Sequence, residues 1–317
     1  MADILTCTVN PTIDTSTSVD HVAPEHKLRC GRPSHEPGGG GINVSRVLLR
    51  MGLESTALFT AGGTMGEWLN RLLAGEGVST IPCPVRGSTR ENFTVLEKAS
   101  SQQYRFGMPG PKLSPAEWEG VLQAAASLDP PPRYLVASGS LPPGVPVSFY
   151  ARMSETVRGR GTRVILDTSG EPLKAAVEAG VYLLKPNMRE LQQLAGRSSD
   201  DSEGLEGIAR ELLDKYPCTA VAVSLGAGGA LLVTGGKSLR ISAPTVNIQS
   251  KVGAGDSMVA GITAGLARHW SLEEAMRYGV AAGTAAVMTP GTELCRRRDV
   301  ERLYRVMTGR GSDSPSG

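Results

Sequence analysis

The sequence predicts an α/β protein with a doubly wound, mostly parallel sheet flanked by helices and a small additional β-sheet. From residue 134 onward, short aliphatic strands alternate with helical segments, which is typical of parallel sheets. Many of these strands end in small or polar residues, as a ligand crevice along one sheet edge requires. Two stretches, at about 15–36 and 88–108, lack helical periodicity and are interpreted as β excursions that form a lid.

The composition is that of an ordinary soluble protein, with 317 residues, 40% hydrophobic and 20% charged. The net charge of +2 gives no general attraction to nucleic acid or to a membrane. Five scattered cysteines form no CxxC or Cys/His cluster, so neither a zinc site nor a disulfide framework is indicated. We expect a cytoplasmic protein with one domain over residues 1–309 and a disordered tail over 310–317.

The first half of the chain contains the expected lid. A buried strand is predicted over residues 4–9, a helix over 44–51, a strand over 56–61 and a helix over 66–76. A hairpin is expected from strands at 90–98 and 103–108. Asp14 follows the first strand, where open α/β sheets bind ligands, although a turn aspartate is the alternative interpretation.

The second half continues the alternation. Strands are predicted at 134–137, 163–166, 182–184, 220–224, 230–234 and 238–241. Helices are predicted at 147–158, 172–178, 188–194, 203–215, 258–267, 272–288 and 298–308. A polar, β-like run at 245–249 leads into the helix that begins near residue 258.

Residues 253–256, Gly-Ala-Gly-Asp, precede that helix and carry the clearest chemical signal. Small residues let the backbone approach a ligand, and a helix N-terminus directs N–H groups at an anion. Asp256 would project into the same place. It suits removal of a proton from a hydroxyl that attacks a phosphate, and an ordinary helix cap is the alternative.

Other motifs leave two interpretations open at this stage. The four glycines at 38–41, followed by Asn43, indicate close approach to a ligand or a flexible linker. Asn187 and Glu190 could hold magnesium or form a helix capping box. The glycine-rich segment 224–229 could wrap a nucleotide or form a tight turn. The lid cations Lys27, Arg29, Arg90 and Arg105 could bind a ligand or be solvated surface charges.

Five ordered segments resemble the ribokinase-like sugar kinases. They are Pro37-Gly-Gly-Gly-Gly-Ile-Asn43, Ser138-Gly-Ser-Leu-Pro-Pro-Gly144, Lys185-Pro-Asn-Met-Arg-Glu190, Ser224-Leu-Gly226 and Val252-Gly-Ala-Gly-Asp256. The resemblance runs from about residue 4 to residue 308. Within the family, the chain is most similar to the branch that contains the bacterial 6-phosphofructokinases. Motifs of P-loop, dinucleotide-binding, GxSxG and HExxH proteins are absent from the sequence.

The resemblance implies a role for each matching position. Asp256 would be the catalytic base, with Gly253, Ala254 and Gly255 as the anion hole. The sugar phosphate would be held by Asp14, Lys27, Arg29, Gly39, Gly40, Gly41, Asn43, Arg90, Arg105 and Ser140. ATP would face Lys185, Asn187, Ser224, Leu225, Gly226, Ala227, Gly228, Gly229 and Ser250. Magnesium would lie near Asn187 and Glu190, and a monovalent cation such as potassium near Ser250, Val252, Ala286, Thr289, Gly291 and Glu293.

The implied reaction is transfer of the ATP γ-phosphoryl group to the 1-hydroxyl of fructose 6-phosphate, with the lid sheet as a homodimer surface. A kinase for tagatose 6-phosphate or fructose 1-phosphate and a non-catalytic sugar- or nucleotide-binding regulator are the alternatives. Lys251 departs from the small polar residue that relatives usually carry, and it either affects cation use or points to solvent. Glu293 is a second departure, since that branch often carries a basic residue there.

Overall fold

The computed structural model describes residues 3–197 and 204–309, so the expected tail at 310–317 lies outside the described part of the chain. The main sheet has nine strands in the order β13-β12-β11-β10-β9-β8-β1-β4-β5. These strands are β1 (Ile4–Thr8), β4 (Thr56–Ala61), β5 (Ser79–Pro84), β8 (Tyr134–Ser138), β9 (Arg163–Asp167), β10 (Leu183–Leu184), β11 (Ala220–Ser224), β12 (Ala230–Thr234) and β13 (Ser238–Ile241).

The strand order reverses at β1, and that reversal determines where a ligand can bind. The chain runs from β1 to β4 and β5 on one side, and from β8 through β9 and β10 to β11 on the other. All of these neighbours pair in parallel, whereas β12 and β13 are added antiparallel at the far edge. The predicted mostly parallel sheet is therefore confirmed, and its switch point lies at the carboxyl ends of β1 and β8.

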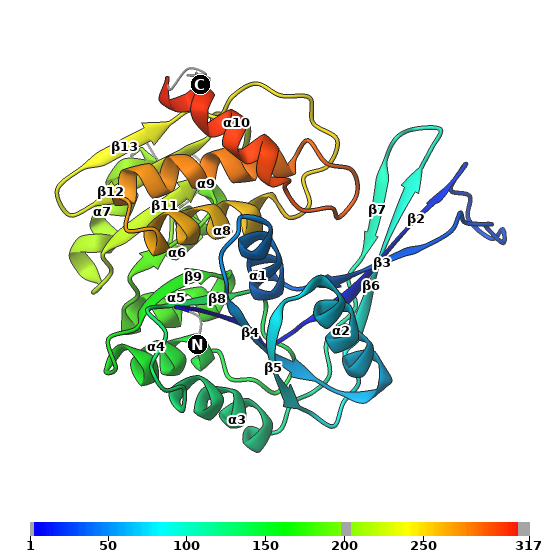
Figure 1. The fold of residues 1–317 in the computed structure, drawn as a ribbon, viewed down its shortest axis with the longest axis horizontal. Coiled ribbons are helices and arrows are strands. Elements are labelled where there is room, and N and C mark those ends of the chain that lie inside the picture. Colours follow the sequence, from blue (N-terminus) through cyan, green and yellow to red (C-terminus); the bar gives the residue numbers. More distant parts are fainter. Residues whose placement is uncertain (1–2, 198–203, 310–317) are drawn as a thin grey trace, which may run out of the picture.

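Helices cover both faces of this sheet, which is buried between two apolar layers (Figure 1). On one face lie α1 (Gly40–Arg50), α2 (Gly63–Glu76), α8 (Ala254–Ala267), α9 (Leu272–Ala286) and α10 (Arg297–Thr308). On the other lie α3 (Pro115–Ala126), α4 (Phe149–Arg158), α5 (Gly170–Ala179), α6 (Met188–Leu194) and α7 (Leu205–Lys215). Within the described residues, none of the helices has the length and apolar character needed to cross a bilayer.

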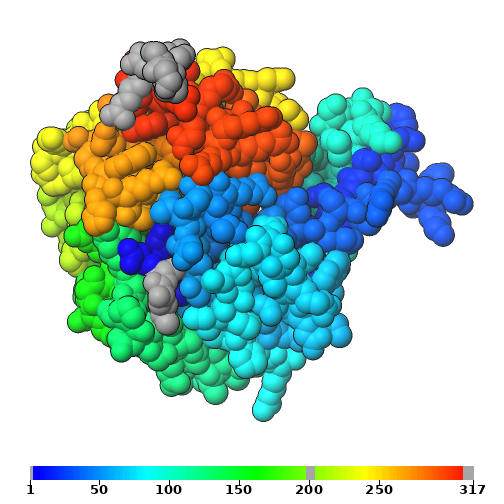
Figure 2. Space-filling view, in the orientation of Figure 1, coloured from blue at the N-terminus to red at the C-terminus, as the bar shows by residue number. Residues whose placement is uncertain are grey.

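The two β excursions join in one four-stranded sheet, as the lid hypothesis requires. Its order is β3-β2-β6-β7, with strands β2 (Thr12–Val19), β3 (Ser34–Gly38), β6 (Arg90–Glu97) and β7 (Gln103–Phe106). Strands β2 and β6 come from different excursions and pair in parallel over their whole length. In Figures 1 and 2 this lid sheet projects from the body as an arm.

Apart from shifts of a few residues at the ends of helices, three elements differ from the predictions. Strand β5 and helix α3 were not predicted. Pro82 and Pro84 in β5 argue against a central strand, but an edge strand tolerates them. The run at 245–249, which is β-like in sequence, does not form a strand: these residues form an irregular connection, in which the Gln249 N–H donates to the Val287 carbonyl at 2.8 Å. A single contact of this kind does not make a ladder.

Candidate active site

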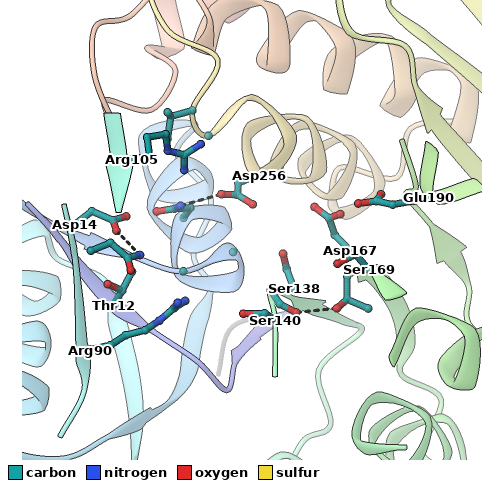
Figure 3. Close-up of a pocket in the computed structure, with 18 residues that line it drawn as sticks. Thr12, Asp14, Arg90, Arg105, Ser138, Ser140, Asp167, Ser169, Glu190 and Asp256 are labelled. Atoms are coloured by element: carbon teal, nitrogen blue, oxygen red, sulfur yellow. Dashed lines mark hydrogen bonds between the residues drawn. The ribbon is translucent and has the colours of Figure 1, made fainter. Parts of the chain in front are cut away.

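A cavity of about 350 Å³ opens at the switch point of the main sheet, beneath the root of the lid (Figure 3). The lid strands β2, β6 and β7 and the ends of β8 and β9 with the loops that follow them reach it, together with the N-terminal ends of α1, α6 and α8. It is lined by Thr12, Asp14, Gly39, Gly40, Asn43, Arg90, Asn92, Arg105, Ser138, Gly139, Ser140, Asp167, Thr168, Ser169, Glu190, Val252, Gly253 and Asp256. The cavity therefore brings together residues from the whole length of the chain.

Asp256 lies in the first turn of α8 and points into the centre of the cavity. The helix begins at Ala254 rather than near 258, because Gly253 adopts a left-handed conformation (φ 73°) that starts it earlier. Burial raises the pKa of the Asp256 carboxyl to about 6, and the negative charge of Asp167 adds to the rise. A carboxylate with a pKa near neutrality is matched to proton transfer at physiological pH.

Asn43 holds this carboxylate from a neighbouring helix. It lies in α1, and its Nδ2 donates a hydrogen bond to Asp256 Oδ2 at 2.8 Å. Helix α1 starts at Gly40, so the last two glycines of the 38–41 run form its first turn. A Cβ on Gly41 would lie 2.6 Å from the Cys7 carbonyl oxygen. The linker interpretation is wrong, because these glycines are packed against β1 and the β8 loop.

The lid contributes Asp14, Arg90 and Arg105 to the side of the cavity opposite Glu190. Arg90 donates to two backbone carbonyls, Met108 O and Asn10 O, both at 2.9 Å. Burial raises the pKa of the Asp14 carboxyl, while the hydrogen bond from Asn92 and the charges of Arg90 and Arg105 counteract the rise. Burial also lowers the pKa of Arg90.

A buried ion pair lies on the side of the cavity away from the lid. Lys185 Nζ lies 3.0 Å from Asp167 Oδ1, and the two side chains are 6% and 16% exposed. Burial alone would lower the pKa of Lys185, but the charge and hydrogen bond of Asp167, together with the charges of Glu190 and Asp256, outweigh the effect of burial, and the pKa ends above its ordinary value. Lys185 lies behind Asp167, close to the first turn of α8: a Cβ built on Gly255 would be 3.8 Å from its Nζ.

Asn187 and Glu190 form the capping box that was one of the two interpretations of this pair. Asn187 Oδ1 accepts from the Glu190 N–H at 2.9 Å, and Glu190 Oε2 accepts from the Asn187 N–H at 2.8 Å. Asn187 is exposed outside the cavity lining, whereas Glu190 lines it. Within the described residues, no group of three or more His, Cys, Asp or Glu side chains is arranged to hold a metal.

Several predicted site residues lie away from the cavity. Lys27 and Arg29 are exposed in the segment between β2 and β3, at the outer end of the lid. Residues 224–229 form the tight turn between β11 and β12, with Leu225 N–H bonded to the Gly229 carbonyl at 2.9 Å. Gly229 is required there by packing, since a Cβ would lie 2.0 Å from the Ile241 carbonyl.

The segment expected to bind a monovalent cation forms two adjacent loops. Ser250 Oγ donates to the Gly291 carbonyl, and Thr289 Oγ1 donates to the Ala286 and Glu293 carbonyls. The Glu293 side chain pairs with Arg296 at 2.8 Å, so its carbonyl is what faces Thr289. Lys251 is exposed. Of its two interpretations, the geometry favours a side chain that points to solvent.

Sequence reasoning missed seven residues that line the cavity: Thr12, Asn92, Ser138, Gly139, Asp167, Thr168 and Ser169. Asp167 could have been found, because it is a carboxylate at the carboxyl end of a predicted strand, the same signal that identified Asp14. Asn92 could not, because its approach to Asp14 depends on the pairing of two strands from different parts of the chain.

Comparison with known proteins agrees with this geometry. Residues 7–298 match the model of the pfkB family of carbohydrate kinases. The chain belongs to that family. The ATP-dependent 6-phosphofructokinase isozyme 2 of Mycobacterium tuberculosis is 47% identical over 96% of this pfkB-family chain and 89% of its own length. The isozyme 2 of Escherichia coli K12 is 41% identical over 97% of the chain and 100% of its own length.

Solved structures place the pfkB-family chain in the ribokinase-like fold. Escherichia coli phosphofructokinase-2 in complex with potassium superposes with a TM-score of 0.92 at 41% identity, covering 97% of this chain and all of that one. Its complex with fructose 6-phosphate gives a TM-score of 0.91 at 40% identity over the same shares. Another structure of that protein is a tetrameric inhibited form. Ribokinase from Thermotoga maritima, 20% identical with a TM-score of 0.77 over 96% of this chain and all of that one, shows the shared fold alone.

Proposed function

We propose that this kinase transfers the γ-phosphoryl group of ATP to the 1-hydroxyl of fructose 6-phosphate, giving fructose 1,6-bisphosphate. The observation that carries the proposal is a carboxylate, Asp256, with a pKa of about 6, facing a cavity that is lined by two arginines on its lid side. The names of its relatives, and the fructose 6-phosphate complex of one of them, support this substrate.

Asp256 would act as the base. It takes the proton of the 1-hydroxyl while the sugar oxygen forms its bond to the γ-phosphorus and the bond to ADP breaks. Above its pKa of about 6, which burial has raised, the carboxylate is free to accept that proton. The hydrogen bond from Asn43 fixes its orientation at 2.8 Å. Positioning of this kind supplies much of the rate in phosphoryl transfer, because the transition state has little bonding for the protein to assist.

The N-terminus of α8 would stabilise the charge on the group in transit. The first N–H groups of a helix have no partner inside the helix, and its dipole favours an anion there. Gly253, Ala254 and Gly255 supply this turn without side chains that would block a phosphate. Asp256 lies on the same turn, so it would be next to the γ-phosphoryl group that the sugar hydroxyl attacks.

The two ends of the cavity suit two different ligands. Arg90, Arg105 and Ser140 would hold the 6-phosphate, with Asp14, Gly39, Gly40 and Asn43 near the sugar hydroxyls. Gly41, in the first turn of α1, packs against β1 and supports that wall. Lys185, Asn187, Ser250 and the turn at 224–229 would face ATP on the other side. Arg90 and Arg105 lie with Asp14 on the lid side of the cavity, whereas Asp167 and Glu190 lie on the other side, and this arrangement supports the division.

Magnesium would be held between ATP and the carboxylates of Asp167 and Glu190, where it would neutralise phosphate charge. These residues fit the ion, since magnesium takes one or two protein carboxylates and keeps several waters. Asn187 is a poorer ligand than expected, because its Oδ1 is engaged in the capping box. Potassium would lie among the carbonyls of the 250–252 and 286–293 loops, and the existence of a potassium complex of the Escherichia coli relative supports the use of this ion.

The lid would also pair with the lid of a second copy in a cytoplasmic homodimer. Its exposed apolar side chains include Leu28, Phe93, Leu96 and Phe106, the last 51% exposed. Phe93 and Phe106 are paired across β6 and β7, and self-association would cover this exposed apolar pair, since exposed apolar patches are characteristic of interfaces. Lys27 and Arg29, at the outer end of the lid, would then reach the site of the partner copy.

A coupled ADP-release assay over a panel of sugars and sugar phosphates tests the proposal. The panel includes fructose 6-phosphate, tagatose 6-phosphate, fructose 1-phosphate and unphosphorylated fructose. We expect the highest kcat/KM with fructose 6-phosphate, and loss of that preference in Arg90→Ala. A higher kcat/KM with fructose 1-phosphate or tagatose 6-phosphate would assign the alternative kinases, and no turnover with any of them would favour a non-catalytic regulator.

A further inference from the structure

Asn92 is a lid residue that lies directly beside Asp14. The parallel pairing of β2 and β6 puts the two residues in register, and Asn92 Nδ2 donates to Asp14 Oδ1 at 3.1 Å. Residues two apart on a strand share a face, so Asn92 also shares the cavity face with Arg90. Asn92 is therefore in contact with one sugar-site residue and adjacent to another.

The orientation of the Asn92 amide is fixed by a second contact. Its Oδ1 accepts a hydrogen bond from the Met108 N–H at 3.0 Å. A backbone N–H is only a donor, so the oxygen of the amide must face Met108 and its NH₂ group must face Asp14. Asn92 can consequently only donate to Asp14, and this favours the ionised, acceptor form of that carboxylate.

The surroundings of Asp14 explain why such a donor is needed. Glu36 on β3 is paired with Asp14 across the sheet, and like charges in this position are unfavourable. Asp256 also faces it from α8, while Arg90 and Arg105 counteract these charges from β6 and β7. The Oδ2 atom lies against Gly38, where a Cβ would be only 2.1 Å away. Asp14 is thus wedged between two strands, and Asn92 is its hydrogen-bond donor on the β6 side.

We propose that Asn92 is a positioning residue of the sugar site, which orients the Asp14 carboxylate and keeps it ionised for the sugar hydroxyls. The inference rests on the proposed function, because Asp14 acts here as a sugar ligand. It deepens that proposal by naming a group that acts through Asp14. Its bond to Met108 also ties this contact to the segment that leaves the lid.

Two substitutions separate the two hydrogen bonds of Asn92. Asn92→Asp keeps an acceptor for the Met108 N–H but replaces the donor to Asp14 with a like charge. Asn92→Leu removes both hydrogen bonds at similar size. Asn70→Asp is the matched control, because Asn70 Oδ1 accepts from Thr80 Oγ1 at 3.0 Å, and an aspartate can still do so far from the cavity.

We expect both variants to raise the KM for fructose 6-phosphate about tenfold, the scale of a lost hydrogen bond to an ionised group, while the KM for ATP stays unchanged. Their pH dependences should be opposite. The defect of Asn92→Asp should grow as pH rises, because two adjacent carboxylates share a proton only at low pH. The defect of Asn92→Leu should shrink as pH rises and Asp14 ionises. Asn70→Asp should behave like the parent.

A ¹³C carboxyl titration of labelled protein gives a reading without substrate, with the Asp14 signal assigned from Asp14→Asn. In Asn92→Leu we expect this signal to titrate at higher pH than in the parent. If the parent fails to phosphorylate fructose 6-phosphate, the proposed function falls, and this titration still decides whether Asn92 controls Asp14. An unmoved titration, or an Asn92→Asp enzyme that matches the parent at alkaline pH, would overturn the proposal and leave Asn92 as an anchor for Met108.

Discussion

Replacing Asp256 with asparagine should make the enzyme inactive and, at alkaline pH, more stable. Asparagine has nearly the same shape, and its Oδ1 can still accept the hydrogen bond that Asn43 donates at 2.8 Å to Asp256. The substitution therefore removes the base and the buried charge with little change in packing. We expect kcat to fall by at least ~10²-fold, the scale of a lost general base.

The gain in stability follows from the pKa of the Asp256 carboxyl. Burial, and then the charge of Asp167, raise this pKa from 3.8 to about 6 in the folded protein. The folded state therefore binds the proton more tightly than the unfolded state. The resulting stabilisation is complete below about pH 3.8 and is lost as pH rises through about 6. At about 1.4 kcal/mol per tenfold change in proton affinity, the loss is about 3 kcal/mol.

Urea unfolding of parent and variant across pH measures this effect. The free energy of unfolding of Asp256→Asn, relative to the parent, should rise by about 2 kcal/mol between about pH 4.5 and about pH 8. Asp214→Asn, on the exposed side of α7, is the matched control and should show no such rise. A difference that stays constant with pH would refute the buried-carboxylate argument, and near-normal turnover would refute the assignment of Asp256 as the base.

Three further predictions concern other parts of the site. Arg90→Ala should raise the KM for fructose 6-phosphate about tenfold or more with a smaller effect on kcat, because the substitution removes a hydrogen-bond donor to the phosphate. The control is Arg71→Ala, which changes an exposed side chain of α2, and an unchanged KM in Arg90→Ala would remove Arg90 from the phosphate site. Arg46→Leu should lower the free energy of unfolding in urea by about 2 kcal/mol, because Arg46 is 3% exposed and contacts Glu76, Glu36 and the Pro37 carbonyl. The partial exposure of the two carboxylates moderates this loss, and an unchanged urea midpoint would contradict the prediction. Potassium chloride should activate the parent and Lys251→Ser equally, because Lys251 is exposed, and sodium chloride is the control. If the parent needs no potassium while Lys251→Ser requires it, the Lys251 ammonium replaces the ion.

The order of strands and helices could be predicted well because most elements are patterned locally. Strands β4, β11, β12 and β13 match their predicted bounds, since each is a short aliphatic or alternating run flanked by turn residues. Strand β5 was missed because its two prolines oppose a strand unless the position in the sheet is known. That position is decided by tertiary packing, which a local pattern does not contain.

The residues of the candidate site likewise divide into those that a local sequence pattern identifies and those that only the fold places. Asp14, Asn43 and Asp256 were identified because each follows a small-residue or strand-end signal, and the cavity brings them together. Lys27 and Arg29 have the same charge as Arg90, and only the path of β2 and β3 puts them at the outer end of the lid. Asn187 and Glu190 were compatible with a magnesium site and with a capping box, the capping box being favoured by the pattern alone, and hydrogen-bond geometry shows that both residues form a cap.

The lid is rooted in the cavity that we propose as the sugar site, and this has a consequence for regulation. Strands β2 and β6 carry Asp14, Arg90 and Asn92 within their first three residues, and β6 carries the exposed apolar residues Phe93 and Leu96 farther along. A ligand that binds those residues therefore also restrains the lid sheet. A molecule that binds and restrains the lid sheet changes the free energy of sugar binding by the same amount as the sugar changes the free energy of binding that molecule. Thermodynamic reciprocity makes the two events a single coupled equilibrium. In this fold, sugar affinity and the state of the arm are properties of the same pair of strands.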